Sequence, residues 1–361
     1  MDRKSAFITT WLTCMLALAG VGVGDVPTSL SAYVSRPSLD QQDTAEISEY
    51  SAYYLDLLAN GDHEAVMKAR AKLVEPMKNI RGNASSAFRS TYADSLIPTL
   101  EDILDGPDVY RGVNAIQIAG FLGTDSSIRM LEQRAAASNE PNASRRLWVA
   151  IAIRESMNNG ELSLRSFNAA ARGLAEAAEE EDDWRVLMRQ FETVSNMVKS
   201  GRSRDEGGED LRATGRELQL RMMKGTLDRI LAADDGETVH IELIQALRPN
   251  IFDVQQQYLD PELMQYRREV GLNMAPQLAR VYDVILLHGD ALRNDEELSD
   301  CCGLSLRLSD ETLRLIEADL GSDEAPDLEP EQLWKDNDTE ALREGREAWK
   351  AILTKSPYNG R

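Results

Sequence analysis

Apolar residues recur at helical spacing along most of this chain, and no strand-like alternation of apolar and polar residues stands out. The clearest stretch is residues 107–131. Its first part carries an apolar residue every three or four positions, and Gly123, in a Leu-Gly-Thr-Asp turn, marks the end of that helix. A second helix begins after that turn. The pattern therefore predicts an all-α protein with paired helices.

The helix pair at residues 107–131 is partly repeated in the next unit. The start of its second helix, residues 127–129, recurs 36 positions on as residues 163–165. A helix pair with such a period is typical of stacked α-helical repeats. Four residues of the first helix recur 35 positions later: Arg111, Ala115, Ile116 and Ile118 correspond to Arg146, Ala150, Ile151 and Ile153.

Residues 107–123 resemble a HEAT-type repeat. They have an arginine at the start of the first helix, Arg111, a small residue four positions on, Ala115, and Leu-Gly before the second helix. Residues 146–153 carry a degenerate copy without the Leu-Gly ending. The resemblance is clearest over residues 107–178 and implies a curved stack of helix pairs whose inner surface binds proteins or peptides. It implies no functional residues, because the shared positions are packing positions.

Outside the repeat, helical spacing predicts a first helix at about residues 47–58 and one long helix at residues 211–231. It also predicts helices over residues 309–320 and 341–353. Three prolines within or beside helical patterns are expected to kink, halt or interrupt their helices, because proline lacks an N–H donor and clashes with the preceding turn. They are Pro98, Pro249 and Pro276.

These elements predict a division of the chain into five parts. The fold class expected is all-α, a short right-handed α-solenoid of HEAT-like stacked helix pairs followed by an irregular helical C-terminal region. The charged, glycine-rich residues 201–210 are the best linker. The expected parts are a signal peptide at 1–24, a flexible lead-in at 25–45, the repeat region at 46–200, the linker at 201–210, and the C-terminal region with its acidic tail segment at 211–361.

The N-terminus has the features of an export signal. Arg3 and Lys4 precede a mostly apolar stretch at residues 6–23, and small residues suited to cleavage lead up to Gly24. We expect a secreted or periplasmic protein with no membrane insertion after cleavage. An uncleaved N-terminal membrane anchor is the alternative, because the apolar stretch is near the shortest length that spans a bilayer.

Charge narrows the range of partners. The 361 residues include 40 Lys and Arg against 61 Asp and Glu, a formal net charge of −21. Such a surface repels nucleic acid at long range, so no nucleic-acid partner is expected. A solvated acidic surface is the simplest interpretation, and a basic partner is also compatible with it.

Few residues suggest chemistry. The histidines, His63, His240 and His288, have no metal-ligand partner at helical spacing, and no catalytic motif is present. We therefore expect no catalytic, cofactor-binding or metal-binding residues and no cofactor. The acidic run at residues 179–183 offers oxygen ligands for calcium, but consecutive residues rarely converge on one ion. A favourable charge at a helix start is the simpler interpretation.

The cysteines form no disulfide framework. Cys14 lies in the expected signal peptide, and Cys301 and Cys302 are adjacent in sequence. A disulfide between neighbouring residues is strained, so partly buried thiols are expected. A vicinal ring or redox switch is the alternative.

Together these features predict an exported acidic α-helical repeat protein that acts as an interaction scaffold for a protein or peptide, and not as an enzyme. Two alternatives stay open. One is an envelope hydrolase or lyase with its site in the C-terminal half, using His240, His288 and nearby carboxylates. The other is a calcium-responsive surface protein.

Overall fold

The computed structural model describes residues 29–78, 84–199, 211–232, 240–321 and 324–358. Every regular element in these ranges is a helix, which confirms the all-α prediction. Two 3₁₀ helices, η1 (Ile241–Leu243) and η2 (Pro261–Tyr266), accompany the α-helices. The α-helices are α1 (Gln41–Asn60), α2 (His63–Lys78), α3 (Ser86–Asp105), α4 (Val109–Leu122), α5 (Asp125–Glu132), α6 (Ala143–Asn159), α7 (Leu164–Ala178), α8 (Trp184–Lys199), α9 (Leu211–Leu231), α10 (Ile244–Leu259), α11 (Arg267–Arg293), α12 (Glu296–Asp319), α13 (Pro330–Lys335) and α14 (Thr339–Leu353).

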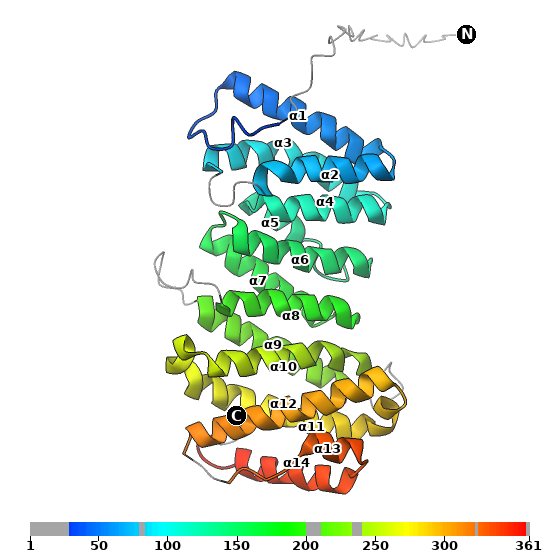
Figure 1. Cartoon of the computed structure of the whole chain (residues 1–361), viewed down its shortest axis with the longest axis vertical. Helices are drawn as coiled ribbons and strands as arrows, with labels where there is room; N and C mark the ends of the chain where they lie inside the picture. Colours follow the sequence, from blue (N-terminus) through cyan, green and yellow to red (C-terminus); the bar gives the residue numbers. More distant parts are fainter. Residues whose placement is uncertain (1–28, 79–83, 200–210, 233–239, 322–323, 359–361) are drawn as a thin grey trace, which may run out of the picture.

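The helices lie in two rows along the long axis of the molecule (Figure 1). The front row is α2, α4, α6, α8, α10 and α12, and each helix packs on the next one in that row. The rear row is α3, α5, α7, α9, α11 and α14, packed in the same sequential way. Helix α1 packs on α2 and α3 at one end, and α13 packs on α12 and α14 at the other.

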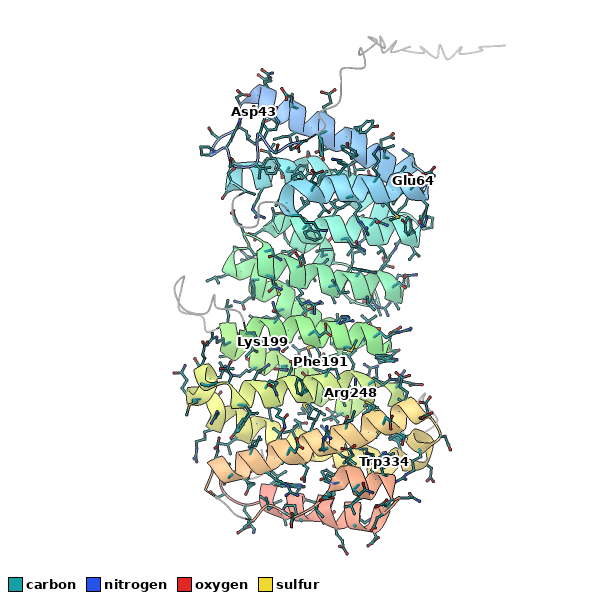
Figure 2. The ribbon with its side chains drawn as sticks, viewed as in Figure 1. Asp43, Glu64, Phe191, Lys199, Arg248 and Trp334 are labelled. Carbon is teal, nitrogen blue, oxygen red and sulfur yellow. The ribbon has the colours of Figure 1, made fainter. Side chains whose placement is uncertain are left out.

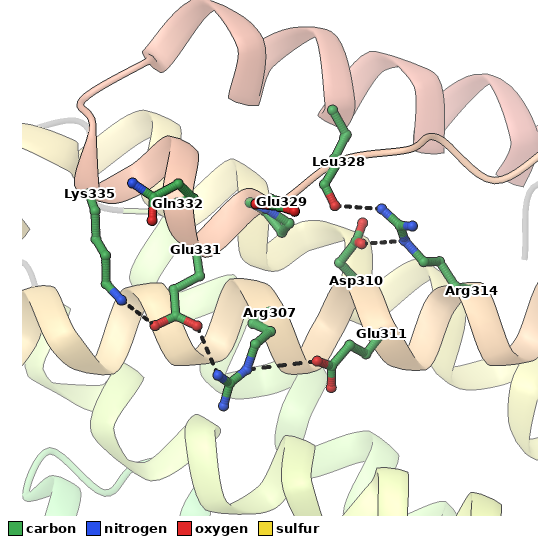
Figure 3. A pocket seen from close by; sticks show the side chains of 10 residues that line it. Arg307, Asp310, Glu311, Arg314, Leu328, Glu329, Glu331, Gln332 and Lys335 are labelled. Atoms are coloured by element: carbon green, nitrogen blue, oxygen red, sulfur yellow. Dashed lines mark hydrogen bonds and ion pairs between the residues drawn. The ribbon is translucent and has the colours of Figure 1, made fainter.

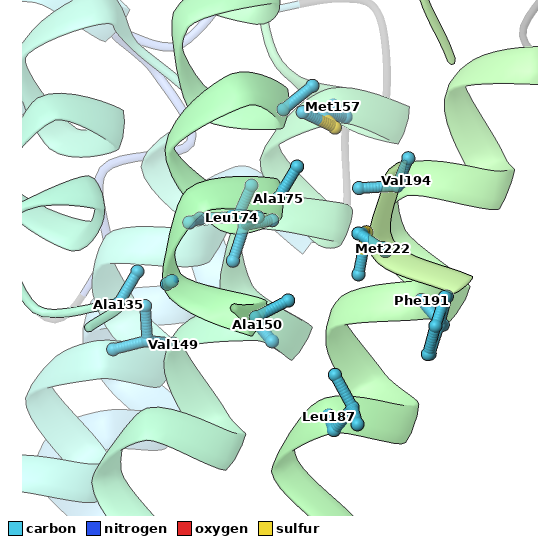
Figure 4. Packing of buried hydrophobic residues seen from close by; sticks show 14 of the residues in the cluster. Ala135, Val149, Ala150, Met157, Leu174, Ala175, Leu187, Phe191, Val194 and Met222 are labelled. Carbon is cyan, nitrogen blue, oxygen red and sulfur yellow. The ribbon is translucent and has the colours of Figure 1, made fainter. Parts of the chain in front are cut away.

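Apolar side chains from both rows fill the space between them. Figure 4 shows the middle of this core, where Val149 of α6, Leu174 of α7, Phe191 of α8 and Met222 of α9 are almost completely buried. One cluster of such residues runs from Leu30 to Tyr358. Each large apolar side chain buried in this way stabilises the fold by roughly 1.5–3 kcal/mol.

Helices α4 and α6 approach each other closely through small residues. A Cβ atom added to Gly120 would lie 2.9 Å from the Cα of Ala152, so only glycine fits at this spacing. Gly123 ends α4 with a left-handed φ of 57°, as its position predicts, and a Cβ there would lie 2.5 Å from the Cα of Gly160. The two glycines set the separation of these neighbouring helices.

The predicted halt at Pro249 and interruption at Pro276 are wrong, and α3 does not break at Pro98. Pro98 lies inside α3, Pro249 inside α10 and Pro276 inside α11, and each helix continues past its proline. At Pro98 the reason is visible: Pro98 and Asp94, the residue one turn earlier, are both exposed, so water can satisfy the carbonyl group that proline leaves without a partner. Packing on the buried side of the helix outweighs the local cost.

The expected flexible lead-in at residues 25–45 differs from the structure where it is described. Leu30 and Val34 are buried in the core, and α1 already begins at Gln41. Asp40 caps that helix by accepting a hydrogen bond from the backbone N–H of Asp43. Buried apolar residues in this turn therefore order the segment before α1. The expected signal peptide, residues 1–24, lies outside the described residues.

The two rows continue into the C-terminal half. The expected linker, residues 201–210, lies outside the described residues, yet α8 before it packs on both α9 and α10 after it. The expected irregular arrangement after residue 211 is not what the described helices show, because α9 to α12 extend both rows. Among the described helices, none is both long enough and apolar enough to cross a membrane.

Candidate functional site

The three histidines have separate surroundings. His240 precedes η1, with its Nε2 3.5 Å from Oδ1 of Asp182. His288 lies within α11, and its Nε2 is 2.8 Å from the carbonyl oxygen of Ile230. His63 stacks on Tyr110. Within the described ranges, no three histidine, cysteine or carboxylate side chains come together as a metal site.

Arginines hold the acidic run at residues 179–183. Glu181 is fully buried and accepts hydrogen bonds of 2.7 Å from both Nε and Nη2 of Arg146. This hydrogen-bonded pair raises the pKa of Arg146. The carboxylates therefore face guanidinium groups instead of converging on one point. The other ion pairs of the run are Glu179 with Arg221, Asp182 with Arg229, and Asp183 with Arg185.

A polar cavity of about 530 Å³ lies between α12 and the segment that leads into α13 (Figure 3). Most of its charged side chains are paired with one another: Glu331 binds Lys335 and Arg307, and Arg314 binds Asp310. Asp310 is buried and also accepts hydrogen bonds from the Tyr282 hydroxyl and the Trp349 indole, at 3.0 and 2.9 Å. These contacts join α11, α12 and α14, so the cluster holds three helices together.

Cys301 and Cys302 are both buried free thiols in α12, more deeply placed than the partial burial expected. Burial raises the pKa of each thiol. The Sγ atom of Cys301 lies 3.6 Å from the carbonyl oxygen of Ile244. Neither group has the lowered pKa that a reactive thiol needs.

The outward surface of α2, α4, α6 and α8 is the strongest candidate for a binding site, and we call it the front face. Side-chain contacts between successive front-row helices fix the positions of these helices relative to one another, and such contacts continue from α8 to α10. Figure 2 shows the side chains of this row, with Glu64 on α2, Lys199 on α8 and Arg248 on α10 labelled. The contacts are His63 with Tyr110, Arg70 with Gln117, Lys78 with Phe121, Arg154 with Glu192, Asn158 with Asn196, and Lys199 with Asp253.

The surface side chains in the middle of the front face are mostly half-buried. Every residue of α4 is buried or half-buried, and the exposed residues of α6 and α8 lie only near their ends. The rear row differs, since α3 and α9 expose residues along their whole length. Half-buried apolar side chains occur in the middle of the front face: Val113, Phe121, Leu147, Ile151 and Met188.

The front face is cationic although the protein is acidic. Helices α2, α4, α6 and α8 carry eleven Lys and Arg against four Glu, in a chain of net charge −21. Two of the eleven, Arg145 and Arg146, are buried and paired with glutamates outside these helices. Aspartates outside the four helices pair with three of the others: Arg111, Arg185 and Lys199. At its centre, Nη1 of Arg154 and Nη1 of Arg189 each lie 2.6 Å from the carboxylate of Glu192. About one third of each guanidinium side chain is exposed. One carboxylate thus neutralises two cations only in part.

None of these front-face residues belonged to a predicted site. The sequence did carry a signal, because the basic excess of the four helices is visible once their bounds are known. Comparison with protein-family models finds no match for this chain, and comparison with curated proteins finds no significant one. The case for function therefore rests on the geometry and charge of the front face.

Proposed function

We propose that this protein is a HEAT-like α-helical repeat scaffold, a short right-handed α-solenoid, which binds a protein or peptide segment along its front face. The observation that carries the proposal is the band of half-buried apolar and cationic side chains across α4, α6 and α8. Partly shielded apolar groups beside charged ones are typical of binding surfaces, because a partner completes their burial.

Export is part of the same proposal. With cleavage near Gly24, the scaffold is secreted or periplasmic and meets its partner there. Support comes from the basic, apolar and small-residue order of the first 24 positions. Edman sequencing of the mature protein, starting at or near Asp25, is the expected result. An intact Met1 in the native protein would contradict export by cleavage and favour the membrane anchor.

The two alternatives receive less support. His240 lies 3.5 Å from Asp182 and His288 contacts the carbonyl of Ile230, so the two histidines named in the enzyme alternative have different partners and form no shared site. The acidic run at residues 179–183 binds arginines, which compete with any calcium ion for its carboxylates. Neither feature points to a reaction or to an ion-dependent switch.

The proposal is tested by site-specific photo-crosslinking in the native extracellular or envelope fraction. A photoreactive amino acid replaces Ile151 on the front face and, as a matched control, Lys224, which is exposed on the rear row. We expect a discrete crosslinked partner from position 151 and none from position 224. Equal crosslinking from both positions, or none from 151 at any salt concentration, contradicts the proposed scaffold function.

A further inference from the structure

We infer that the partner segment bound by the front face is an acidic peptide segment with apolar side chains between its carboxylates. The inference rests on the proposed scaffold function and names the chemistry of the partner. It begins from an imbalance on the molecule: the front-row helices α2 to α8 are basic, while the chain as a whole is acidic. A complementary partner for this face is therefore negative.

The centre of the face offers a place for one carboxylate. Arg154 and Arg189 each use only Nη1 on Glu192, and the described residues provide no further acceptor for either guanidinium. Each guanidinium has five N–H donors in a planar fork that matches a carboxylate. A partner carboxylate would complete the hydrogen bonding and bring the local charge from positive to neutral. Charge-assisted bonds of this kind are the stronger ones in proteins.

Apolar groups lie beside this pair. Ile151 is about one helical turn before Arg154 on α6, and Met188 is about one helical turn before Glu192 on α8; both side chains are half-buried. A partner residue next to the carboxylate would bury them further. The site therefore selects an acidic residue with an aliphatic neighbour, and a purely polar acidic tract would lose this contribution.

Further cations extend the site along the stack. Lys68 and Lys78 on α2 and Arg248 on α10 form no ion pair with any residue that the structure describes. Packed helices lie about 8–10 Å apart, and an extended peptide advances about 3.3 Å per residue. A segment that runs along the long axis thus crosses one front-row helix about every three residues. Acidic residues at that spacing would meet successive cations.

Nucleic acid fits the face less well than a peptide. Four glutamates are interspersed among the cations: Glu64, Glu75, Glu155 and Glu192. The acidic remainder of the molecule repels a long polyphosphate, whose charge extends far beyond the site. A short acidic peptide keeps the local attraction and meets little of that repulsion.

Fluorescence anisotropy with a synthetic peptide tests the inference on the full mature chain. The probe is a labelled peptide of about 15 residues, enough to cross four or five helices, with Glu at every third position and Leu or Ser between. We expect R154A or R189A to weaken binding about tenfold. E192Q should tighten it by a similar factor, because it releases both guanidiniums. R221A, on the rear row, should leave binding unchanged.

Four outcomes would overturn the inference: no binding of the acidic peptide, tighter binding of a Lys-for-Glu peptide, tighter binding of poly(U) RNA, or weaker binding by E192Q. Thermal melting of each variant shows that it is folded. Competition against the Ile151 crosslink separates the two proposals. If a partner crosslinks at position 151 and excess acidic peptide does not displace it, the partner chemistry is wrong and the scaffold function stands. If nothing crosslinks there, the scaffold function itself fails.

Discussion

At the scale of single residues, arginine side chains link neighbouring helix pairs by hydrogen bonds to backbone carbonyl groups. Arg145 donates to the backbone carbonyls of Leu104, Gly106 and Asp108 at 2.7–3.0 Å, which holds the end of α3 against the start of α6. Arg111 and Arg146, the pair that indicated the repeat in the sequence, have different partners. Arg111 reaches the carbonyl of Gly61, whereas Arg146 binds Glu181. Arginines at matching positions of this degenerate repeat therefore both link neighbouring segments, but they bind different partners.

The close approach of α4 to α6 at Gly120 leads to the first prediction. We expect Gly120→Val to destabilise the fold by about 1–3 kcal/mol, because the new side chain would collide with Ala152 across the α4–α6 interface. Gly225→Ala is the matched control. Its Cβ would meet nothing closer than 4.0 Å, so alanine should stabilise α9 by about 0.5–1 kcal/mol. Urea unfolding of both variants measures the two effects, and equal effects would contradict the packing account.

The second prediction concerns the adjacent thiols. Burial raises the pKa of Cys301 and Cys302, so both stay protonated and inaccessible in the folded protein at neutral pH. We expect no reaction with a thiol-specific chromogenic reagent in the native state and two equivalents per mature chain after unfolding in guanidinium. Rapid native labelling, or fewer than two thiols in the unfolded chain, would favour the alternative of a redox-active pair.

At the scale of helices, regular apolar spacing predicted where helices lie better than prolines predicted where they end. The helix predicted at residues 211–231 coincides with α9, because Gly-rich and charged residues precede it and its apolar spacing is continuous. The predictions at Pro249 and Pro276 failed because local rules omit the packing that holds α10 and α11 on both sides. Helix α12 likewise begins at Glu296, well before the predicted start at Ser309, since one side of its first turns is buried, with Cys301 against Ile244 of α10.

The continuity of the rows across residues 200–210 leads to the third prediction. Buried amides link the helices on both sides of this segment: Gln257 donates to Ser195 of α8 and to Gln219 of α9. We expect a chain cut at a protease site inserted within residues 200–210 to remain one particle. The two halves should co-elute in gel filtration and unfold in one transition. Spontaneous separation of two stable halves would instead support independent domains.

At the scale of the whole molecule, the candidate site lay beyond what the sequence could predict. The front face joins outward positions of four helices, and the pair of Arg154 and Arg189 on Glu192 brings α6 and α8 together. Helical spacing indicates which residues point away from the core, but it does not say which helix lies beside which. The net charge was misleading for the same reason, because most of the acidic residues lie outside helices α2, α4, α6 and α8.

The fourth prediction is loss of the fold at high pH. Burial raises the pKa of Tyr50, Tyr92, Tyr258, Tyr282 and Tyr358. A group whose folded pKa lies above its unfolded value stabilises the fold fully below the unfolded value, which is about 10 for tyrosine. That stability is lost as the pH rises beyond it. We expect the melting temperature to fall steeply above about pH 10, together with tyrosinate absorbance. An unchanged melting temperature through pH 11 would contradict this expectation.

The sequential packing of the two rows has a mechanical consequence. Along most of the stack, each described helix packs mainly on its neighbours in the two rows. A small change in the angle at each interface adds up over the whole length, so the ends can move far while every local contact shifts little. We therefore expect the molecule to bend and extend easily along its long axis, so that its length adjusts to a segment bound along it.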